Sequence, residues 1–189
     1  MFKESLFNRD TFKGLSRKDI CCLVDFYKHK EDNENHVEEK GLKFVLKKIQ
    51  EELYLSVIEK YSLFLIATDN IFEICCAEIL LELKELFPNI RIYCFSYKKM
   101  PIVFKTKNER ERYKRVLEFA DRVIYYDKVE LTNSDQNKIM YMINSSSKVV
   151  LFNDGSLQSK KALEYIKSFK INAVIVNKNM KDRYIKTVL

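Results

Sequence analysis

The sequence is poor in the residues that form tight turns and phosphate-binding loops. Of its 189 residues only three are glycine (Gly14, Gly41 and Gly155), two are proline (Pro88 and Pro101), and none is tryptophan. Proteins on average contain about 7% glycine and about 5% proline. Because glycine lets backbone amides approach a phosphate closely, its scarcity predicts that no glycine-rich nucleotide loop is present.

Long apolar runs are also missing. No segment approaches the ~18 apolar residues of a membrane span. The N-terminal stretch MFKESLFNRDTFKG has no apolar core of signal-peptide length. We therefore expect a cytoplasmic protein without membrane contacts.

The cysteine pattern argues against disulfides and metal sites. The five cysteines form two adjacent pairs and one single residue, each inside an apolar run: Cys21, Cys22, Cys75, Cys76 and Cys94. Adjacent side chains point apart on a strand or a helix, so neither pair has metal-ligand spacing. We expect buried free thiols in a reducing compartment, with no metal site and no cofactor.

The charge of the chain is basic but dispersed. The formal net charge is +7, and Lys and Arg are spread over nearly every expected helix. The most basic segment, Lys105 to Arg115 (KTKNERERYKR), has glutamates between its cations, which favours a solvated face over a nucleic-acid groove. Tyr125, Tyr126 and Tyr141 could stack on bases, but aromatic residues at strand ends and on helix faces are usually packed in the core or at its rim. The sequence therefore favours a protein without a nucleic-acid partner.

Short apolar runs alternate with longer amphipathic ones from residue 20 onward, as in repeated βα units. Helices are expected at about 41–60, 71–86, 107–120, 133–145 and 157–169, and the apolar face of the second is assigned to Ile71, Ile74, Cys75, Ile79, Leu83 and Leu86. The six expected strands are Ile20 to Phe26, Leu63 to Thr68, Ile90 to Ser96, Arg122 to Tyr126, Lys148 to Phe152 and Ala173 to Asn177. Right-handed crossovers then predict an α/β fold of the Rossmann-like doubly wound class, with a mainly parallel sheet of five to six strands and helices on both faces.

A chain of this length fits one domain. We expect that domain over residues 20–179, with a peripheral extension at 1–19 and a terminal helix or tail at 180–189. The charge-dense stretch His29 to Lys40 is expected to be a solvated loop, in which His29 and His36 face the solvent. Apolar helix faces and edge strands make a homodimer a candidate assembly.

Polar residues follow several expected strands at the point where ligands bind in open α/β sheets. Asp25 ends the first strand, Asp69 and Asn70 follow the second, and Asp154 follows the fifth. Carboxylates at this edge would repel a phosphate but accept hydrogen bonds from ribose hydroxyls. The candidate ligand-binding residues are Asp25, Thr68, Asp69, Asn70, Glu73, Asp154, Gly155 and Ser156.

Each of these residues also has a structural interpretation. Asn70, three residues before Glu73, matches a capping box for the second helix. The turn at Asp154 to Ser156 fits a helix N-cap, with positive φ at the glycine between them. Asp25 is equally consistent with a buried hydrogen-bonded carboxylate and with a site residue.

Several blocks of this chain resemble the YpsA-like bacterial branch of the SLOG superfamily, over about residues 20–177. They are ICCLVDF near the start, LFLIATDNIFEICCAEILLELKELFPNIRI, ERERYKRVLEFADRVIYY and KIMYMINSSSKVVLFNDGS. Matching positions include Cys76-Ala77-Glu78, Arg112-Tyr113, Ala120-Asp121, Tyr141 to Asn144, and Asp154-Gly155-Ser156. The resemblance implies a Rossmann-like fold with a pocket for a nucleotide or a nucleotide-derived ligand.

The departures from that family fall mainly in the pocket. Val24 to Lys28 replaces a T-G-H-R-P type turn, and Ile66 to Glu73 replaces an S-G-x-A-x-G-x-D turn, so that both glycines are lost and the aspartate becomes Glu73. The family's R-N pair before Y-M is Lys138-Ile139 here, and its G-G-T is Leu157-Gln158-Ser159. Scaffold positions are kept while pocket positions have changed.

Three functional hypotheses follow. The first is a non-catalytic, degenerate SLOG-like domain that binds a nucleotide-derived small molecule through a remodelled pocket or serves as a scaffold for a protein partner. The second is an enzyme acting on an N-glycosidic bond of a nucleotide-derived substrate, with Asp25, Glu73 or Asp154 as acid or base. The third is a nucleic-acid-binding module that uses the Lys105 to Arg115 face.

Overall fold

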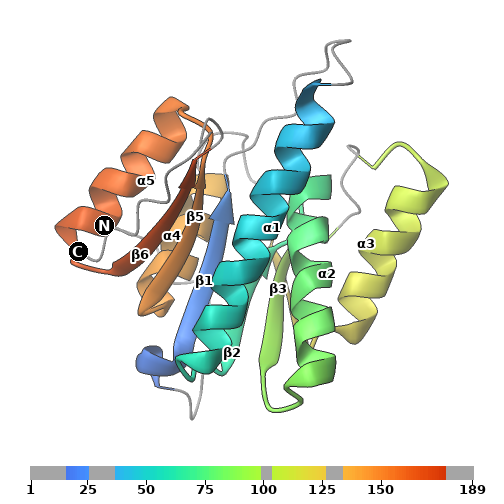
Figure 1. Ribbon diagram of the computed structural model, residues 1–189, viewed down its shortest axis with the longest axis horizontal. Helices are drawn as coiled ribbons and strands as arrows, with labels where there is room; N and C mark the ends of the chain where they lie inside the picture. The colour runs from blue at the N-terminus through green and yellow to red at the C-terminus, as the bar shows by residue number, and fades with distance from the viewer. Residues whose placement is uncertain (1–15, 26–36, 99–103, 127–133, 178–189) are drawn as a thin grey trace.

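The computed structural model describes residues 16–25, 37–98, 104–126 and 134–177 (Figure 1). The expected loop at 29–36 with its two histidines, the extension over residues 1–15 and the tail at 180–189 lie outside the described residues. A short 3-10 helix, η2 (Arg17–Asp19), precedes the first strand. No described helix combines the length and the apolar character needed to cross a membrane.

One six-stranded sheet organises the described chain. All strand pairs are parallel, and the order across the sheet is β4-β3-β2-β1-β5-β6. The strands are β1 (Ile20–Asp25), β2 (Leu63–Ala67), β3 (Arg91–Tyr97), β4 (Arg122–Tyr126), β5 (Lys148–Asn153) and β6 (Asn172–Asn177). The central strands are buried along their whole length, as expected for a parallel sheet covered on both faces.

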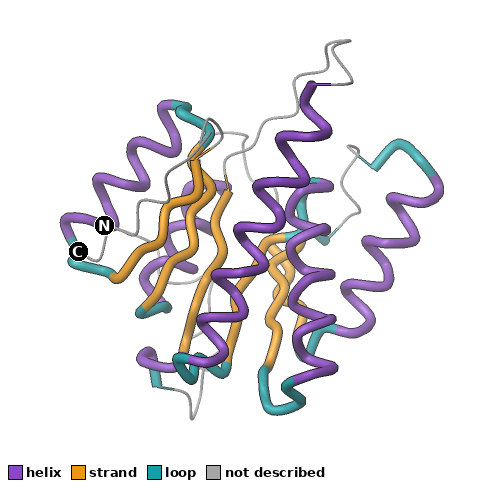
Figure 2. Tube along the Cα trace, in the orientation of Figure 1, coloured by secondary structure: helices purple, strands orange, loops and turns teal. Residues whose placement is uncertain are grey.

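Helices cover both faces of this sheet (Figures 1 and 2). The helices are α1 (Val37–Ile58), α2 (Ile71–Leu86), α3 (Lys107–Phe119), α4 (Ser134–Ser145) and α5 (Leu157–Ser168). One apolar core lies beneath α1, α2 and α3, and a second core lies between the sheet and α4 and α5. The predicted Rossmann-like doubly wound α/β class is therefore confirmed.

The strand order places a topological switch at β1. The chain winds from β1 outward to β4, then returns through α4 to β5 on the other side of β1. In open α/β sheets, ligands bind outside the carboxyl ends of the strands at such a switch. Asp25, the last residue of β1, is 6% exposed at this point.

Two local expectations were wrong. Helix α1 begins at Val37, inside the stretch that was expected to be a loop as far as Lys40. The buried face of α2 is rotated from the expected one, because Phe72, Cys76 and Leu80 are buried whereas Leu86 is 71% exposed. Helix α2 is flanked by both α1 and α3, so apolar residues occur around most of its circumference, and spacing alone did not identify the inner face.

The two cysteine pairs point apart as expected. Cys21 packs in the core beneath α1 and α2, whereas Cys22 packs in the core on the opposite face of the sheet. All five cysteines are free thiols, and four are buried. Cys75 departs from the expectation, because it is partly exposed and its sulfur accepts a hydrogen bond of 3.1 Å from Arg112.

Thiol labelling of the folded protein should reflect this arrangement. Burial raises the pKa of Cys21 to about 12, and it also raises the pKa values of Cys22, Cys76 and Cys94. We expect a thiol-specific reagent to modify Cys75 first and the other cysteines only after unfolding. Mass spectrometry of labelled peptides would measure this order, and Cys75→Ser should abolish the fast phase. Fast labelling of Cys22 in the folded state would contradict the packing described here.

Candidate functional site

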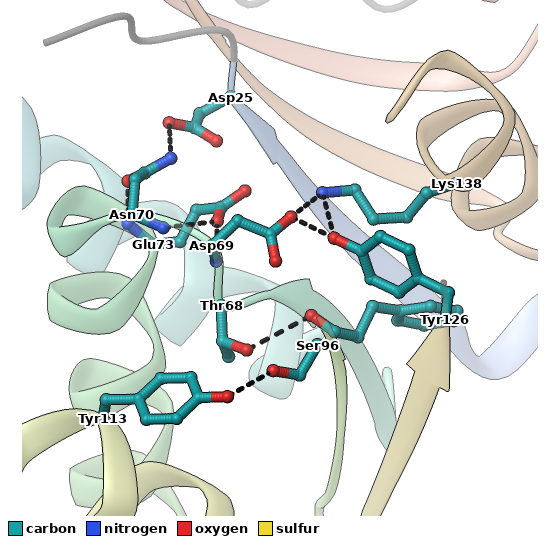
Figure 3. Close-up of polar contacts among 10 residues, drawn as sticks. Asp25, Thr68, Asp69, Asn70, Glu73, Ser96, Tyr113, Tyr126 and Lys138 are labelled. Carbon is teal, nitrogen blue, oxygen red and sulfur yellow. Dashed lines mark hydrogen bonds and ion pairs between the residues drawn. The ribbon is translucent and has the colours of Figure 1, made fainter. Parts of the chain in front are cut away.

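The candidate site lies at the carboxyl edge of the sheet, where polar side chains from four elements meet (Figure 3). Asp25 comes from β1, and Asp69, Asn70 and Glu73 come from the β2–α2 connection and the first turn of α2. Tyr126 ends β4, and Lys138 comes from α4 on the opposite face of the sheet. Asp25, Glu73, Tyr126 and Lys138 are each at most 6% exposed. The fold therefore builds a largely buried polar cluster at the edge where open α/β sheets bind ligands.

The start of α2 is closed by a complete capping box. The side-chain oxygen of Asn70 accepts from the backbone amide of Glu73 at 2.9 Å. In return, Glu73 Oε2 accepts from the backbone amides of Asp69 at 2.5 Å and Asn70 at 3.2 Å. The predicted cap is confirmed. The backbone amides of Asp69, Asn70 and Glu73 at this helix start are therefore occupied by the protein's own side chains and not offered to a phosphate.

A second link ties β1 to this cap. The Asn70 side-chain amide donates to Asp25 Oδ2 at 3.3 Å. Burial raises the pKa of Glu73 well above its ordinary value, and the neighbouring Asp25 carboxylate raises it further, while the Lys138 ammonium opposes the shift. The two carboxyl groups thus form a buried acid pair that favours retention of a proton.

The Asp69 carboxylate is bound by side chains from β4 and α4. Its Oδ2 accepts hydrogen bonds from both the Tyr126 hydroxyl and the Lys138 ammonium, which also donates to the Tyr126 oxygen at 3.2 Å. Burial raises the pKa of Tyr126, and the adjacent Asp69 carboxylate raises it further, so this phenol stays protonated. The buried lysine compensates the charge of Asp69.

Not every candidate residue joins this cluster. Thr68 is fully buried, and its hydroxyl donates to the carbonyl of Phe95 at 3.2 Å, which ties β2 to β3. Beside it, Ser96 shares a hydrogen bond of 2.8 Å with the buried hydroxyl of Tyr113 (Figure 3). Thr68 therefore holds the end of β2 against β3, directly before the connection that carries Asp69 and Asn70.

The Asp154 to Ser156 turn lies at the end of β5, next to β1 in the sheet. Asp154 Oδ1 accepts from the Ser156 amide at 2.9 Å, and Ser156 caps α5 by accepting from Ser159. Gly155 has φ of +82°, a conformation that favours glycine. The predicted turn and N-cap are confirmed, and the turn follows β5, the strand that pairs with the end of β1 at Asp25.

Two members of the cluster, Tyr126 and Lys138, were missing from the sequence-based candidates. Lys138 lies four residues before Met142, so it occupies the inward face of α4 that also carries Met142 and Ile143. Two signals were available, a single lysine on an apolar helix face and its place at the R-N pair of the family that the chain resembles. Tyr126 had no comparable sequence signal, because an aromatic residue at the end of a strand usually packs in the core.

The basic segment is solvated. Lys107, Lys114 and Arg115 on α3 are exposed, and Lys107 pairs with Glu111 at 3.6 Å along the helix surface. Arg112 instead turns toward α2, where it forms an ion pair with Glu78. Among the described residues, no group of three or more His, Cys, Asp or Glu side chains is placed to hold a metal ion.

The stability of the protein should depend on pH through Glu73. Its folded-state pKa is raised, so the native state binds more protons than the unfolded state between the ordinary pKa of about 4.5 and the raised folded pKa. This contribution to stability is complete below the unfolded pKa and is lost as the pH rises through the folded pKa. Glu73→Gln keeps a neutral side chain that can still accept and donate, so we expect its free energy of unfolding to fall less with pH than that of the wild type.

Urea denaturation at several values between about pH 5 and about pH 8 would measure this difference. Glu85→Gln, at the exposed far end of the same helix, is the matched control and should keep the wild-type slope. Parallel pH profiles for the wild type and Glu73→Gln would show that Glu73 does not hold the proton.

Comparison with known proteins gives no family for this chain. No protein-family model matches the sequence, and no curated protein matches it. The fold and the geometry of the polar cluster are therefore the basis for the functional conclusion.

Proposed function

We propose that this protein is a non-catalytic, degenerate SLOG-like module that binds a phosphate-free, nucleoside-like ligand at the carboxyl edge of its sheet. The single observation that carries the proposal is the closed capping box of Asn70 and Glu73. It occupies helix amides that would otherwise cradle a phosphate, and the carboxyl groups beside it suit hydroxyl donors. The resemblance of residues 20–177 to the SLOG superfamily supports the nucleotide-derived character of the ligand.

The position of Asp25 supports the same proposal. This carboxyl group stands at the topological switch, where Rossmann-like sheets bind ligands. Its neighbour Asn70 already donates to one of its oxygens, which fixes the orientation of the carboxyl group. In dinucleotide-binding folds an acidic side chain at this edge recognises ribose hydroxyls. A nucleoside sugar is therefore the group that we assign to Asp25.

Thermal denaturation against matched nucleosides and nucleotides tests the proposal. A ligand at 100 times its dissociation constant adds about 2.7 kcal/mol of stability. We expect a nucleoside to raise the melting temperature, Asp25→Asn to remove the shift, and the exposed control Glu85→Gln to keep it. Stabilisation by nucleotides alone would refute the proposal. No shift with any ligand would favour the scaffold hypothesis, in which this edge binds no small molecule.

An enzymatic function is the second candidate, and the acid pair of Glu73 and Asp25 favours it. A carboxyl group with a raised pKa beside a second carboxyl group is the pattern of acid–base catalysis at an N-glycosidic bond. Release of free base from nucleosides and nucleotides, followed by chromatography, would detect such activity. Turnover that survives replacement of Asp25, Glu73 and Asp154 together would exclude these residues as the catalysts.

A further inference from the structure

The outer flank of α1 carries apolar side chains in contact with solvent. Phe44, Leu55 and Ile58 are 43%, 41% and 54% exposed. The helix buries a different face against the sheet and α2, through Val45, Ile49 and Leu53 among others. Single exposed apolar residues are ordinary on a protein surface, so an interface is indicated only by how these residues are arranged.

The exposed residues form one stripe with a symmetric order. Phe44, Lys48, Glu51 and Leu55 are separated by four, three and four positions, so all four lie on one side of the helix. Read in either direction, the stripe is an apolar residue, a charge, the opposite charge and an apolar residue. Lys48 and Glu51 already pair at 2.7 Å, and both stay partly exposed.

We propose that this stripe is a homodimer interface, in which α1 packs antiparallel against α1 of a second copy. A two-fold axis between Lys48 and Glu51 would bring Phe44 opposite Leu55 of the second copy, and Lys48 opposite its Glu51. Each apolar residue then meets an apolar residue and each charge meets the opposite charge. A two-fold interface must be complementary to itself, and this sequence order satisfies that condition.

A parallel arrangement would instead place Lys48 opposite Lys48 and Glu51 opposite Glu51, which is unfavourable. The charge pattern therefore selects the second copy as the partner and the antiparallel direction as its orientation.

The solution mass of the full chain tests this interface. We expect sedimentation equilibrium of the wild type to show a concentration-dependent dimer with twice the mass of the 22.6 kDa chain. Leu55→Glu should abolish the dimer over the same concentrations, because a charge would face Phe44. Phe119→Ser changes an apolar residue on α3 that is more exposed than Leu55 and lies outside the stripe, so it should leave the dimer intact.

Exchanging the charges of Lys48 and Glu51 tests whether the dimer uses this stripe and not another surface. Lys48→Glu alone places like charges opposite each other twice, so we expect the dimer dissociation constant to rise at least tenfold. The double variant Lys48→Glu with Glu51→Lys restores opposite charges across the axis and should recover most of the affinity. Circular dichroism would confirm that each variant stays folded. A wild type that remains monomeric, or a double variant that is no tighter than Lys48→Glu, would overturn the proposal.

Discussion

Replacing Lys138 with methionine should lower the free energy of unfolding by about 3–5 kcal/mol, because it leaves a buried carboxylate without its cation. Lys138 is 4% exposed, and its ammonium contacts the Asp69 carboxylate. Methionine keeps an unbranched apolar side chain, so the loss of stability would come from the missing charge and not from a change in side-chain volume. Urea denaturation followed by circular dichroism would measure the change.

A double-mutant cycle makes this test specific. Asp69→Asn removes the charge that Lys138 compensates, so the double variant with Lys138→Met should be more stable than the sum of the single changes predicts. Lys48→Met breaks a partly exposed ion pair with Glu51 and should cost about 1 kcal/mol or less. Equal losses for Lys138→Met and Lys48→Met would contradict the buried pair at the site.

Replacing Phe72 with alanine should cost about 3–5 kcal/mol, the range found when a buried phenylalanine is truncated. Phe72 lies in the first turn of α2 and is fully buried, with its ring centroid 5.0 Å from that of Phe152 on β5. This contact anchors the start of α2, which carries Asn70 and Glu73, to the centre of the sheet. We therefore expect the same change to weaken ligand binding at the edge.

Chemical denaturation would measure the stability loss, and Phe72→Leu should lose less because it leaves a smaller cavity. Phe119→Ala removes an aromatic ring that is 58% exposed and should change stability by no more than about 0.5 kcal/mol. A loss of stability for Phe72→Ala as small as that for Phe119→Ala would contradict the packing of α2 against β5.

The sequence predicted the sheet well because buried parallel strands are short apolar runs with clear ends. The bounds of β4, Arg122–Tyr126, agree with the expectation, and those of the other strands differ by one residue at one or both ends. The start of α1 was missed because residues before Gly41 are charged and polar, as in a loop. The orientation of α2 was missed because apolar residues surround most of that helix.

The candidate site was predicted in part for a similar reason. Asp25, Asp69, Asn70 and Glu73 could be assigned together because they follow neighbouring strands, and strand order fixes what lies at the carboxyl edge. Lys138 is 69 positions from Asp69 in the chain and comes from the opposite face of the sheet. The contact of Lys138 with Asp69 depends on the path of α4 across the sheet from β4 to β5. Local sequence patterns do not specify that path.

The most direct test of the proposed binding site is isothermal titration of the wild type with a nucleoside and with its 5′-monophosphate. The capping box of Asn70 and Glu73 occupies the Asp69, Asn70 and Glu73 amides at the start of α2, and a phosphate there would approach the carboxyl groups beside them. We therefore predict that the nucleoside binds more tightly than the monophosphate. Tighter binding of the monophosphate would contradict the account of this edge as a site without a phosphate cradle.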